Sequence, residues 1–298
     1  MSEPLLIIAN PVSGGGRGSK TAQHAKAYLE EQGVAAQVLF TSGKGHATEL
    51  AQVALNSGMP RIIACGGDGL IHEMVNVLAT SNTELGLLPA GRGNDLARAL
   101  GIPTHPQRAA RLLIDGAVRR IDLGRVNGRF FSTIVTLGLD SEVAHLVYEK
   151  LVPFSGTGAY IIAVLRTLRH YAGVHLRMSG DFGVVEQLTL LAATGNTASY
   201  GGGMKILPGA DPSDGLLDIC HVRMMRPFDV LKLFPTVFWG GHPSLPEVTL
   251  YRSASVRLES SQPCRLFADG EPVGNTPATI QVVPKALAVV VPSDRPIV

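Results

Sequence analysis

The segment Ile62-Ile-Ala-Cys-Gly-Gly-Asp-Gly-Leu-Ile-His-Glu-Met-Val-Asn-Val-Leu78 decides the fold of this chain. Its first four residues are apolar and suit a short buried strand, and the residues after the glycines show helical spacing. The turn between them is Gly66-Gly67-Asp68-Gly69. Glycines let backbone N–H groups approach phosphate oxygens, and a helix N-terminus carries a partial positive charge. The segment therefore predicts a strand, an anion-binding loop and a helix.

The same alternation of short apolar and longer amphipathic runs continues through the first 120 residues. It predicts a Rossmann-like α/β domain with a parallel sheet. Three glycine-rich loops, 10–18, 66–69 and 91–95, follow strand ends, where open α/β sheets bind their ligands. The expected strands are 5–10, 37–40, 61–65 and 85–88, and the expected helices are 20–32, 46–57 and 71–80.

Asp68 distinguishes the loop 66–69 from a dinucleotide-binding fingerprint. A carboxylate repels bare phosphate unless a divalent cation lies between them, so the pattern indicates a magnesium nucleotide. A tight structural turn is the alternative for this loop taken alone, and the two other glycine-rich loops favour the anion site. No Gly-Lys-Ser/Thr stands at the spacing of a Walker P-loop.

From about residue 121 the pattern changes to period-two runs with turn signals, including the hairpin sequence Val126-Asn-Gly-Arg129. We expect a nucleotide-binding α/β domain over 1–124 and a mostly antiparallel β-sandwich domain over 125–284, with the tail 285–298 returning to the first. The second domain also has two helical patterns, 158–171 and 227–239. Its expected strands are 130–137, 174–178, 187–194, 216–222, 256–258, 264–268, 279–283 and 286–291.

Composition excludes several classes of protein. The 298 residues are 45% hydrophobic with a net charge of +2, which does not suit a disordered chain or a general nucleic-acid binder. No apolar run reaches the roughly 18 to 20 residues of a transmembrane helix, and the N-terminus does not resemble a signal peptide. Three widely spaced cysteines match neither a disulfide framework nor a zinc site. We expect a cytoplasmic protein, either soluble or peripheral to the inner face of the membrane.

Four motifs occur in order along the chain: Asn10-Pro-Val-Ser-Gly14, Gly66-Gly-Asp-Gly69, Pro89-Ala-Gly-Arg-Gly-Asn-Asp95 and Asp269-Gly-Glu271. Together they resemble the catalytic family of diacylglycerol and sphingosine kinases, in particular its soluble bacterial lipid kinases. The resemblance covers essentially the whole chain. Gly-Gly-Asp-Gly alone is less specific, because NAD kinases and phosphofructokinases share it.

The resemblance implies an ATP-binding α/β domain, a β-rich lipid-substrate domain and an active site in the cleft between them. The implied reaction is magnesium-dependent transfer of the γ-phosphoryl group of ATP to a hydroxyl of diacylglycerol or a related lipid, at a membrane surface. Whether the protein forms a homodimer is left open. The implied nucleotide contacts are Asn10, Ser13, Gly14, Thr41, Gly66, Gly67, Asp68, Gly69, Leu70, Ile71, His72, Gly91, Arg92 and Asn94.

Two further sets of residues follow from the resemblance. The hydroxyl needs a proton acceptor, and the resemblance favours Glu271 in this role, with Asp269 as the alternative. A structural magnesium is implied in the acidic segment 208–218, where a plain turn is the alternative. Its implied ligands are Asp211, Asp214 and Leu216, the last by its carbonyl oxygen, and the acids implied to organise a magnesium nearer the nucleotide are Asp68, Asp95 and Asp122.

The chain departs from the common family pattern at three positions, with Leu70 for the usual Thr, His72 for the usual Asn and Arg92 for a frequent Thr. These changes affect the expected nucleotide affinity more than the reaction class. Two rival functions stay open. One is an NAD kinase-like phosphotransferase, which the lack of an Asn-Glu dipeptide in the second half disfavours, and the other is a catalytically silent nucleotide-binding regulator.

Two surface questions also stay open. The first concerns arginines between residues 108 and 129, which form either a solvated face or a site for anionic headgroups. The second concerns the group Phe228, Leu231, Phe234, Phe238 and Trp239, which is either core or in contact with a bilayer, and here we expect core.

Overall fold

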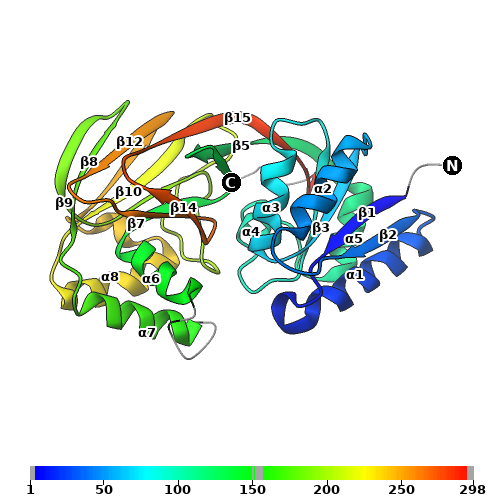
Figure 1. The fold of residues 1–298 in the computed structure, drawn as a ribbon, viewed down its shortest axis with the longest axis horizontal. Helices are drawn as coiled ribbons and strands as arrows, with labels where there is room; N and C mark the ends of the chain where they lie inside the picture. The colour runs from blue at the N-terminus through cyan, green and yellow to red at the C-terminus, as the bar shows by residue number, and fades with distance from the viewer. Residues whose placement is uncertain (1–3, 150, 152–156, 294–298) are drawn as a thin grey trace. The chain divides into compact units, whose positions relative to one another are not determined.

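The computed structural model of the chain describes residues 4–149, 151 and 157–293, with the side chains of 157–161 left out (Figure 1). Its contacts divide it into two compact units. The α/β unit comprises Met1–Leu123, Pro212–Asp214 and Val283–Val298, and the β-rich unit comprises Gly124–Asp211 and Gly215–Val282. In the described part of the chain, no helix is long and apolar enough to cross a membrane.

The α/β unit contains a parallel sheet in the order β2-β1-β3-β4, with the end of β15 (Ala278–Val291) beside β4. β1, β3 and β4 are buried along nearly their whole length. Strands of this kind occur in parallel sheets that are covered on both faces. The strand bounds are β1 Leu5–Ala9, β2 Ala36–Phe40, β3 Arg61–Gly66 and β4 Glu84–Pro89.

Helices connect these strands as expected, α1 packing against α5 and α2 against α3. The prediction that the loop 10–18 is open throughout is wrong, because α1 already begins at Ser13. Gly14, Gly15 and Gly16 nevertheless have φ of 59°, 76° and 92°, so this first turn is not regular helix. The bounds are α1 Ser13–Glu31, α2 His46–Asn56, α3 Asp68–Leu78, α4 Asp95–Ala99 and α5 Pro106–Asp115.

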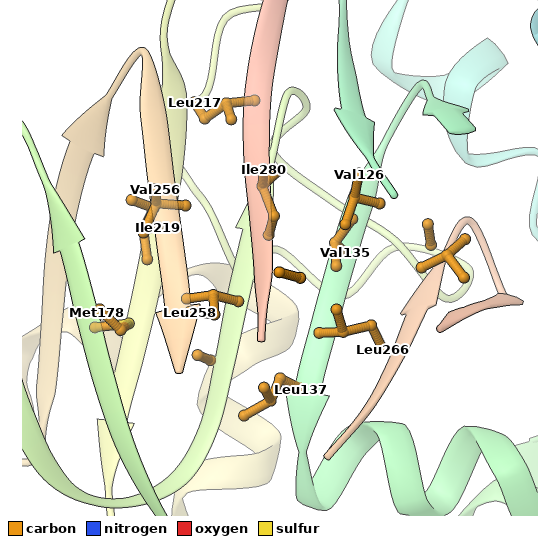
Figure 2. Close-up of a cluster of buried hydrophobic side chains, with 14 of the residues drawn as sticks. Val126, Val135, Leu137, Met178, Leu217, Ile219, Val256, Leu258, Leu266 and Ile280 are labelled. Atoms are coloured by element: carbon orange, nitrogen blue, oxygen red, sulfur yellow. The ribbon is translucent and has the colours of Figure 1, made fainter. Parts of the chain in front are cut away.

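The β-rich unit is built on an antiparallel sheet in the order β14-β13-β7-β9-β8-β12-β15, with β10 and β11 attached beyond β9. Alternate residues of these strands meet in one apolar core that includes Leu137, Met178 and Ile219 (Figure 2). The bounds are β5 Ala117–Val126, β6 Arg129–Phe131, β7 Ile134–Gly138, β8 Val174–Gly180, β9 Gly183–Gly195, β10 Leu217–Arg223, β11 Val248–Ser253, β12 Ser255–Ser260, β13 Arg265–Ala268 and β14 Glu271–Asn275.

Three helices of the β-rich unit, with the 3-10 turn η1 His242–Ser244, pack on a second apolar cluster, which includes Leu168, Leu190 and Leu233. The predicted helix 227–239 is confirmed, and the predicted helix 158–171 begins one residue earlier and ends at Leu168. The helix bounds are α6 Leu139–Tyr148, α7 Thr157–Leu168 and α8 Pro227–Trp239.

The predicted fold class is confirmed, and two predicted strands are corrected. Residues 130–137 do not form one strand, because Ser132 and Thr133 turn to donate hydrogen bonds to Asp269. Residues 279–283 and 286–291 belong to one strand, β15, whose first half pairs with β12 and whose end pairs with β4. The last residues of the tail, 294–298, lie outside the described part.

Candidate functional site

The three glycine-rich loops lie together at one edge of the parallel sheet. Ala9 pairs with Cys65 and Gly66 with Pro89, so β1, β3 and β4 end at nearly the same level. The loops continue the pairing beyond these ends. The Asn10 N–H donates to the Cys65 carbonyl at 3.0 Å, and the Ala90 N–H donates to the Gly66 carbonyl at 2.8 Å.

The loops approach one another too closely for side chains. A Cβ atom added at Gly91 would lie 2.5 Å from the Gly67 Cα, and one added at Gly14 would lie 2.2 Å from the Ala90 carbonyl oxygen. Neither contact involves a flexible side chain that can move away. These glycines are therefore required for packing of the loops.

The Asp68 carboxylate joins the second loop to the third. Its Oδ2 accepts the N–H of Asn94 at 3.0 Å, and its Oδ1 accepts the N–H of Asp95 at 2.7 Å, at the start of α4. The Asn94 backbone has a φ of 53°, and its side-chain Oδ1 accepts the Gly91 N–H at 2.8 Å. The side chains of Asp68 and Asn94 thus both accept backbone N–H groups, so they stabilise the loops whether or not a ligand is bound.

Arg17 connects the first loop to the third and was not among the expected site residues. Its Nε donates to the Gly14 carbonyl at 3.1 Å, and its Nη2 donates to the Gly91 carbonyl at 2.8 Å. Glu73 was also missed, and its carboxylate accepts the N–H of Gly45 at 3.0 Å and of Thr48 at 3.2 Å. The position of Arg17 inside the glycine-rich run was an available signal, whereas the role of Glu73 depends on tertiary packing.

The side chains that depart from the family pattern have different surroundings. Leu70 and His72 are buried, as is Ile71 between them, whose N–H donates to the Gly67 carbonyl at 3.2 Å. A Cβ added at Gly66 would lie 3.1 Å from the Leu70 Cβ, so Leu70 covers that glycine. Arg92 is exposed and therefore accessible to an anion.

The remaining expected residues of this unit lie near the loops. Thr41 follows β2 and is buried, its N–H donating to the Ala9 carbonyl at 2.9 Å. Ser13 opens α1, with its Oγ 3.4 Å from a Cβ built on Gly66. Gly69 lies in the first turn of α3, where N–H groups have no acceptor within the helix. Backbone donors at this edge are thus available to a polyanion.

Asp269 and Glu271 lie in the hairpin between β13 and β14. Asp269 and Gly270 have φ of 51° and 82°, typical of a tight two-residue turn. The Asp269 carboxylate accepts the N–H groups of Ser132 and Thr133, both at 2.9 Å, and their hydroxyls at 3.3 and 2.6 Å. Glu271 begins β14, paired with Ala268, and is half-buried.

The residues expected near a metal are only partly brought together. Asp122 is buried, its Oδ1 accepting the Lys285 N–H at 2.7 Å and its own N–H donating to the Pro212 carbonyl at 2.7 Å. Within the described residues, no group of three or more His, Cys, Asp or Glu side chains is placed to hold a metal ion. The predicted structural magnesium site has only two such side chains, Asp211 and Asp214, together with the carbonyl of Leu216. It stays a prediction.

An apolar cavity in the β-rich unit lies among α6, α7, α8 and the sheet, with Asp140 and His242 as polar members of its lining. Its volume is about 50 Å³. Burial lowers the pKa of His242 although its Nε2 lies 2.9 Å from the Ile206 carbonyl oxygen. Burial among these apolar side chains thus favours the neutral form of the imidazole.

Comparison with known proteins agrees with the motifs. Residues 4–126 match the family described as "Diacylglycerol kinase catalytic domain", and residues 133–291 match "YegS C-terminal NAD kinase beta sandwich-like domain". The chain is 40% identical over 297 residues to a protein of Mycobacterium tuberculosis (strain ATCC 25618 / H37Rv) named diacylglycerol kinase, with 97% of this chain and 95% of the relative covered.

Two further relatives extend this similarity. A Staphylococcus epidermidis protein named diacylglycerol kinase is 30% identical, over 99% of this chain and 94% of its own. A crystal structure of a diacylglycerol kinase from Bacillus anthracis str. Sterne superimposes with a TM-score of 0.79 at 26% identity, covering 98% of each chain.

Proposed function

Because the chain belongs to the diacylglycerol kinase family and is a lipid kinase, we propose that it transfers the γ-phosphoryl group of ATP, with Mg²⁺, to a hydroxyl of diacylglycerol or a related lipid. The α/β unit binds the nucleotide in this proposal, and the β-rich unit binds the lipid. The observation that carries it is the meeting of three glycine-rich loops at the carboxyl edge of one parallel sheet.

The loop geometry supports the nucleotide role. Phosphate groups bind backbone N–H groups and helix N-termini, and here α3 and the glycines 14 and 15 present such donors at one sheet edge. Arg92 is exposed beside these donors and adds a cation for a polyphosphate. The other expected nucleotide-binding residues, which include Asn10, Thr41 and Asn94, would act by holding the loops in place or by contacting the nucleotide through backbone atoms.

Two carboxylates suit magnesium beside the nucleotide. A Cβ added at Gly93 would lie 2.6 Å from Asp68 Oδ2 and 3.4 Å from Asp95 Oδ2, so both acids face the same glycine. Magnesium takes oxygen ligands and is usually held by one or two carboxylates with waters and phosphate oxygens. The bound ion would neutralise charge on the phosphates. In this proposal Asp122 helps to organise the magnesium site, while its Oδ1 accepts the Lys285 N–H.

The hairpin residues suit different roles. A proton acceptor needs lone pairs that can reach the substrate hydroxyl. The Asp269 carboxylate accepts four hydrogen bonds from Ser132 and Thr133, so its lone pairs are largely engaged. This favours Glu271 as the proton acceptor and gives Asp269 the role of holding the hairpin.

A radiolabel assay tests the proposal. The protein is given γ-labelled ATP with mixed micelles of diacylglycerol, sphingosine or phosphatidylglycerol, and separately with NAD. We expect label in a chloroform-soluble product that requires both Mg²⁺ and diacylglycerol. Label in NADP would move the assignment to an NAD kinase-like enzyme. Nucleotide binding without any transfer would support a silent regulator.

A further inference from the structure

Helix α8 (Pro227–Trp239) carries a second apolar face that the fold leaves in solvent. The expectation that its aromatic group is core is wrong for most of that group. Phe228 is 67% exposed, Trp239 65%, Phe238 45% and Leu231 44%, while Phe234 is half-buried. The inner face of the helix is fully used, since Val230, Leu233 and Val237 are buried there. The helix is therefore apolar on two sides.

The exposed residues form one continuous stripe. At about 100° per residue, positions 228, 231, 238 and 239 fall within an arc of about 120°, and the three buried positions fall on the opposite side. Pro235 lies within the same outer arc. α7, which packs in the same apolar cluster, adds exposed Ile162 and Leu165. Scattered single apolar residues need no explanation, but a contiguous stripe of this kind marks a contact surface.

We propose that this outer face of α8, made of Phe228, Leu231, Phe238 and Trp239, docks onto the surface of a lipid bilayer that contains anionic headgroups. Helices that lie in the membrane interface combine Trp, Phe and Leu on one face with Lys and Arg at its border, and Trp is enriched at the headgroup level. Trp239 is the one tryptophan of the chain. The inference rests on the proposed lipid substrate, because a kinase of bilayer lipids must reach the bilayer surface.

The charges at the border of the stripe complement an anionic surface. The side chains of Arg226 and Lys232 are 86% and 66% exposed. The Lys232 Nζ lies 4.6 Å from the centroid of the Phe228 ring, so cation and aromatic ring sit together. The Asp229 carboxylate lies 2.9 Å from the Arg226 Nε and 3.7 Å from the Lys232 Nζ. With two cations and one carboxylate, the segment 226–239 has one net positive charge. An acidic partner surface is therefore favoured over a basic one.

The single tryptophan allows a test on the unaltered protein. Vesicles of phosphatidylcholine with phosphatidylglycerol are added, and Trp239 emission is followed together with co-sedimentation of the protein. We expect emission to shift to shorter wavelength, and quenching by lipids brominated on the acyl chain. Co-sedimentation without any change in Trp239 emission would overturn the proposal, because the bilayer would then bind another surface.

Variants separate docking from catalysis. Phe228→Ser with Trp239→Ser should weaken vesicle binding at least tenfold, while Val184→Ser, at a 59% exposed position of β9, should leave it unchanged. Turnover of a water-soluble short-chain diacylglycerol should stay unchanged in the double variant, while turnover of diacylglycerol in vesicles falls. Equal vesicle binding by the double variant, or a concentration-dependent dimer that this variant abolishes, would reject the bilayer as the occupant.

The same experiments distinguish the two proposals. If the unaltered protein does not phosphorylate short-chain diacylglycerol, the proposed function fails whatever the vesicles show. If it phosphorylates this substrate but neither co-sediments with vesicles nor shows a shift in Trp239 emission, the docking surface fails and the kinase assignment stands.

Discussion

Asp68 in the α/β unit and Asp269 in the β-rich unit occupy similar sequence contexts, and both carboxylates hold a backbone segment by hydrogen bonds. Each follows a strand and precedes a glycine, and each accepts two consecutive backbone N–H groups of a distant segment. The hydrogen bonds described for them differ in kind. Asp68 holds the start of α4 through N–H groups, whereas Asp269 also accepts the hydroxyls of Ser132 and Thr133.

This difference separates scaffold from chemistry within each motif. An acid whose oxygens are saturated by backbone and hydroxyl donors maintains a turn and is a poor proton acceptor. Asp68 accepts the N–H groups of Asn94 and Asp95, and because each carboxylate oxygen has two lone pairs, an oxygen that accepts one such bond can still bind a cation. In the β-rich unit we propose that the proton acceptor is instead the neighbouring Glu271. The predictions below test this division.

The largest effect is expected at Glu271. Glu271→Gln should lower kcat by about 100-fold or more, the range of general-base catalysis, while binding of ATP and the unfolding free energy change little. Steady-state kinetics and denaturant unfolding measure these quantities. The matched control is Glu259→Gln on β12, where the carboxylate pairs with Arg257 at 3.0 Å, and it should retain full activity. A fully active Glu271→Gln would assign the proton to another group.

The next effect compares the two aspartates directly. Asp269→Asn replaces an acceptor of four bonds by an amide that faces donors with its own N–H₂, so we expect a loss of about 2–4 kcal/mol in unfolding free energy. Asp68→Asn at the start of α4 should cost about 0.5–2 kcal/mol, as for other helix N-terminal acceptors. Urea titration measures both. Equal losses would contradict this ranking.

The unfolding free energy should depend on pH through a histidine of the β-rich unit. Burial, with a smaller contribution from the charge of Arg223, lowers the pKa of His221 in the β-rich unit to about 4. The unfolded chain, with a histidine pKa near 6.5, then binds a proton that the folded chain does not. Stability is therefore full above pH about 6.5 and falls towards pH 4, at up to about 1.4 kcal/mol per pH unit.

Unfolding followed in urea between pH 7 and 5 measures this slope. His221→Gln should flatten it, whatever the absolute stability of the variant. His175→Gln on β8, which replaces an exposed histidine, is the control and should leave the slope as it is. A slope that survives in His221→Gln would point to other groups, such as the buried His242.

The smallest effect is expected at Arg17. Arg17→Ala removes two hydrogen bonds to the carbonyls of Gly14 and Gly91, each worth about 1 kcal/mol net or less at an exposed site. We expect the KM for ATP to rise by roughly three- to tenfold with little change in kcat. Lys20→Ala, at an exposed position one turn further along α1, should leave KM unaffected. A fall in kcat alone would show that Arg17 does not act through nucleotide binding.

The sequence was most informative where periodicity and turn chemistry agree. The predicted strands around Leu85 and helix around Leu231 are confirmed because buried runs and helical spacing are local signals. The hairpin at Asn127-Gly128 is confirmed with both residues at positive φ. The helices α4, α5 and α6 were not predicted.

Tertiary contacts explain what the sequence could not provide. Nothing local shows that Ser132 and Thr133 break a strand, because the cause is Asp269, more than a hundred residues later in the chain. The burial of one face of α8 was readable from spacing, but an exposed apolar face has the same sequence pattern as a buried one. The hydrogen bonds from Ser132 and Thr133 to Asp269 likewise join segments far apart in the chain, so the sequence could not show them.

The strand β15 has a practical consequence for dissecting this protein. Its end pairs with β4 through Ala288 and Val289, and Ala286 accepts the Thr80 N–H at 2.7 Å. A fragment that stops at Leu123 would leave β4 as a bare sheet edge, and such edges invite association with other chains. Soluble expression of the isolated α/β unit therefore calls for grafting the 283–291 strand back onto it through a linker.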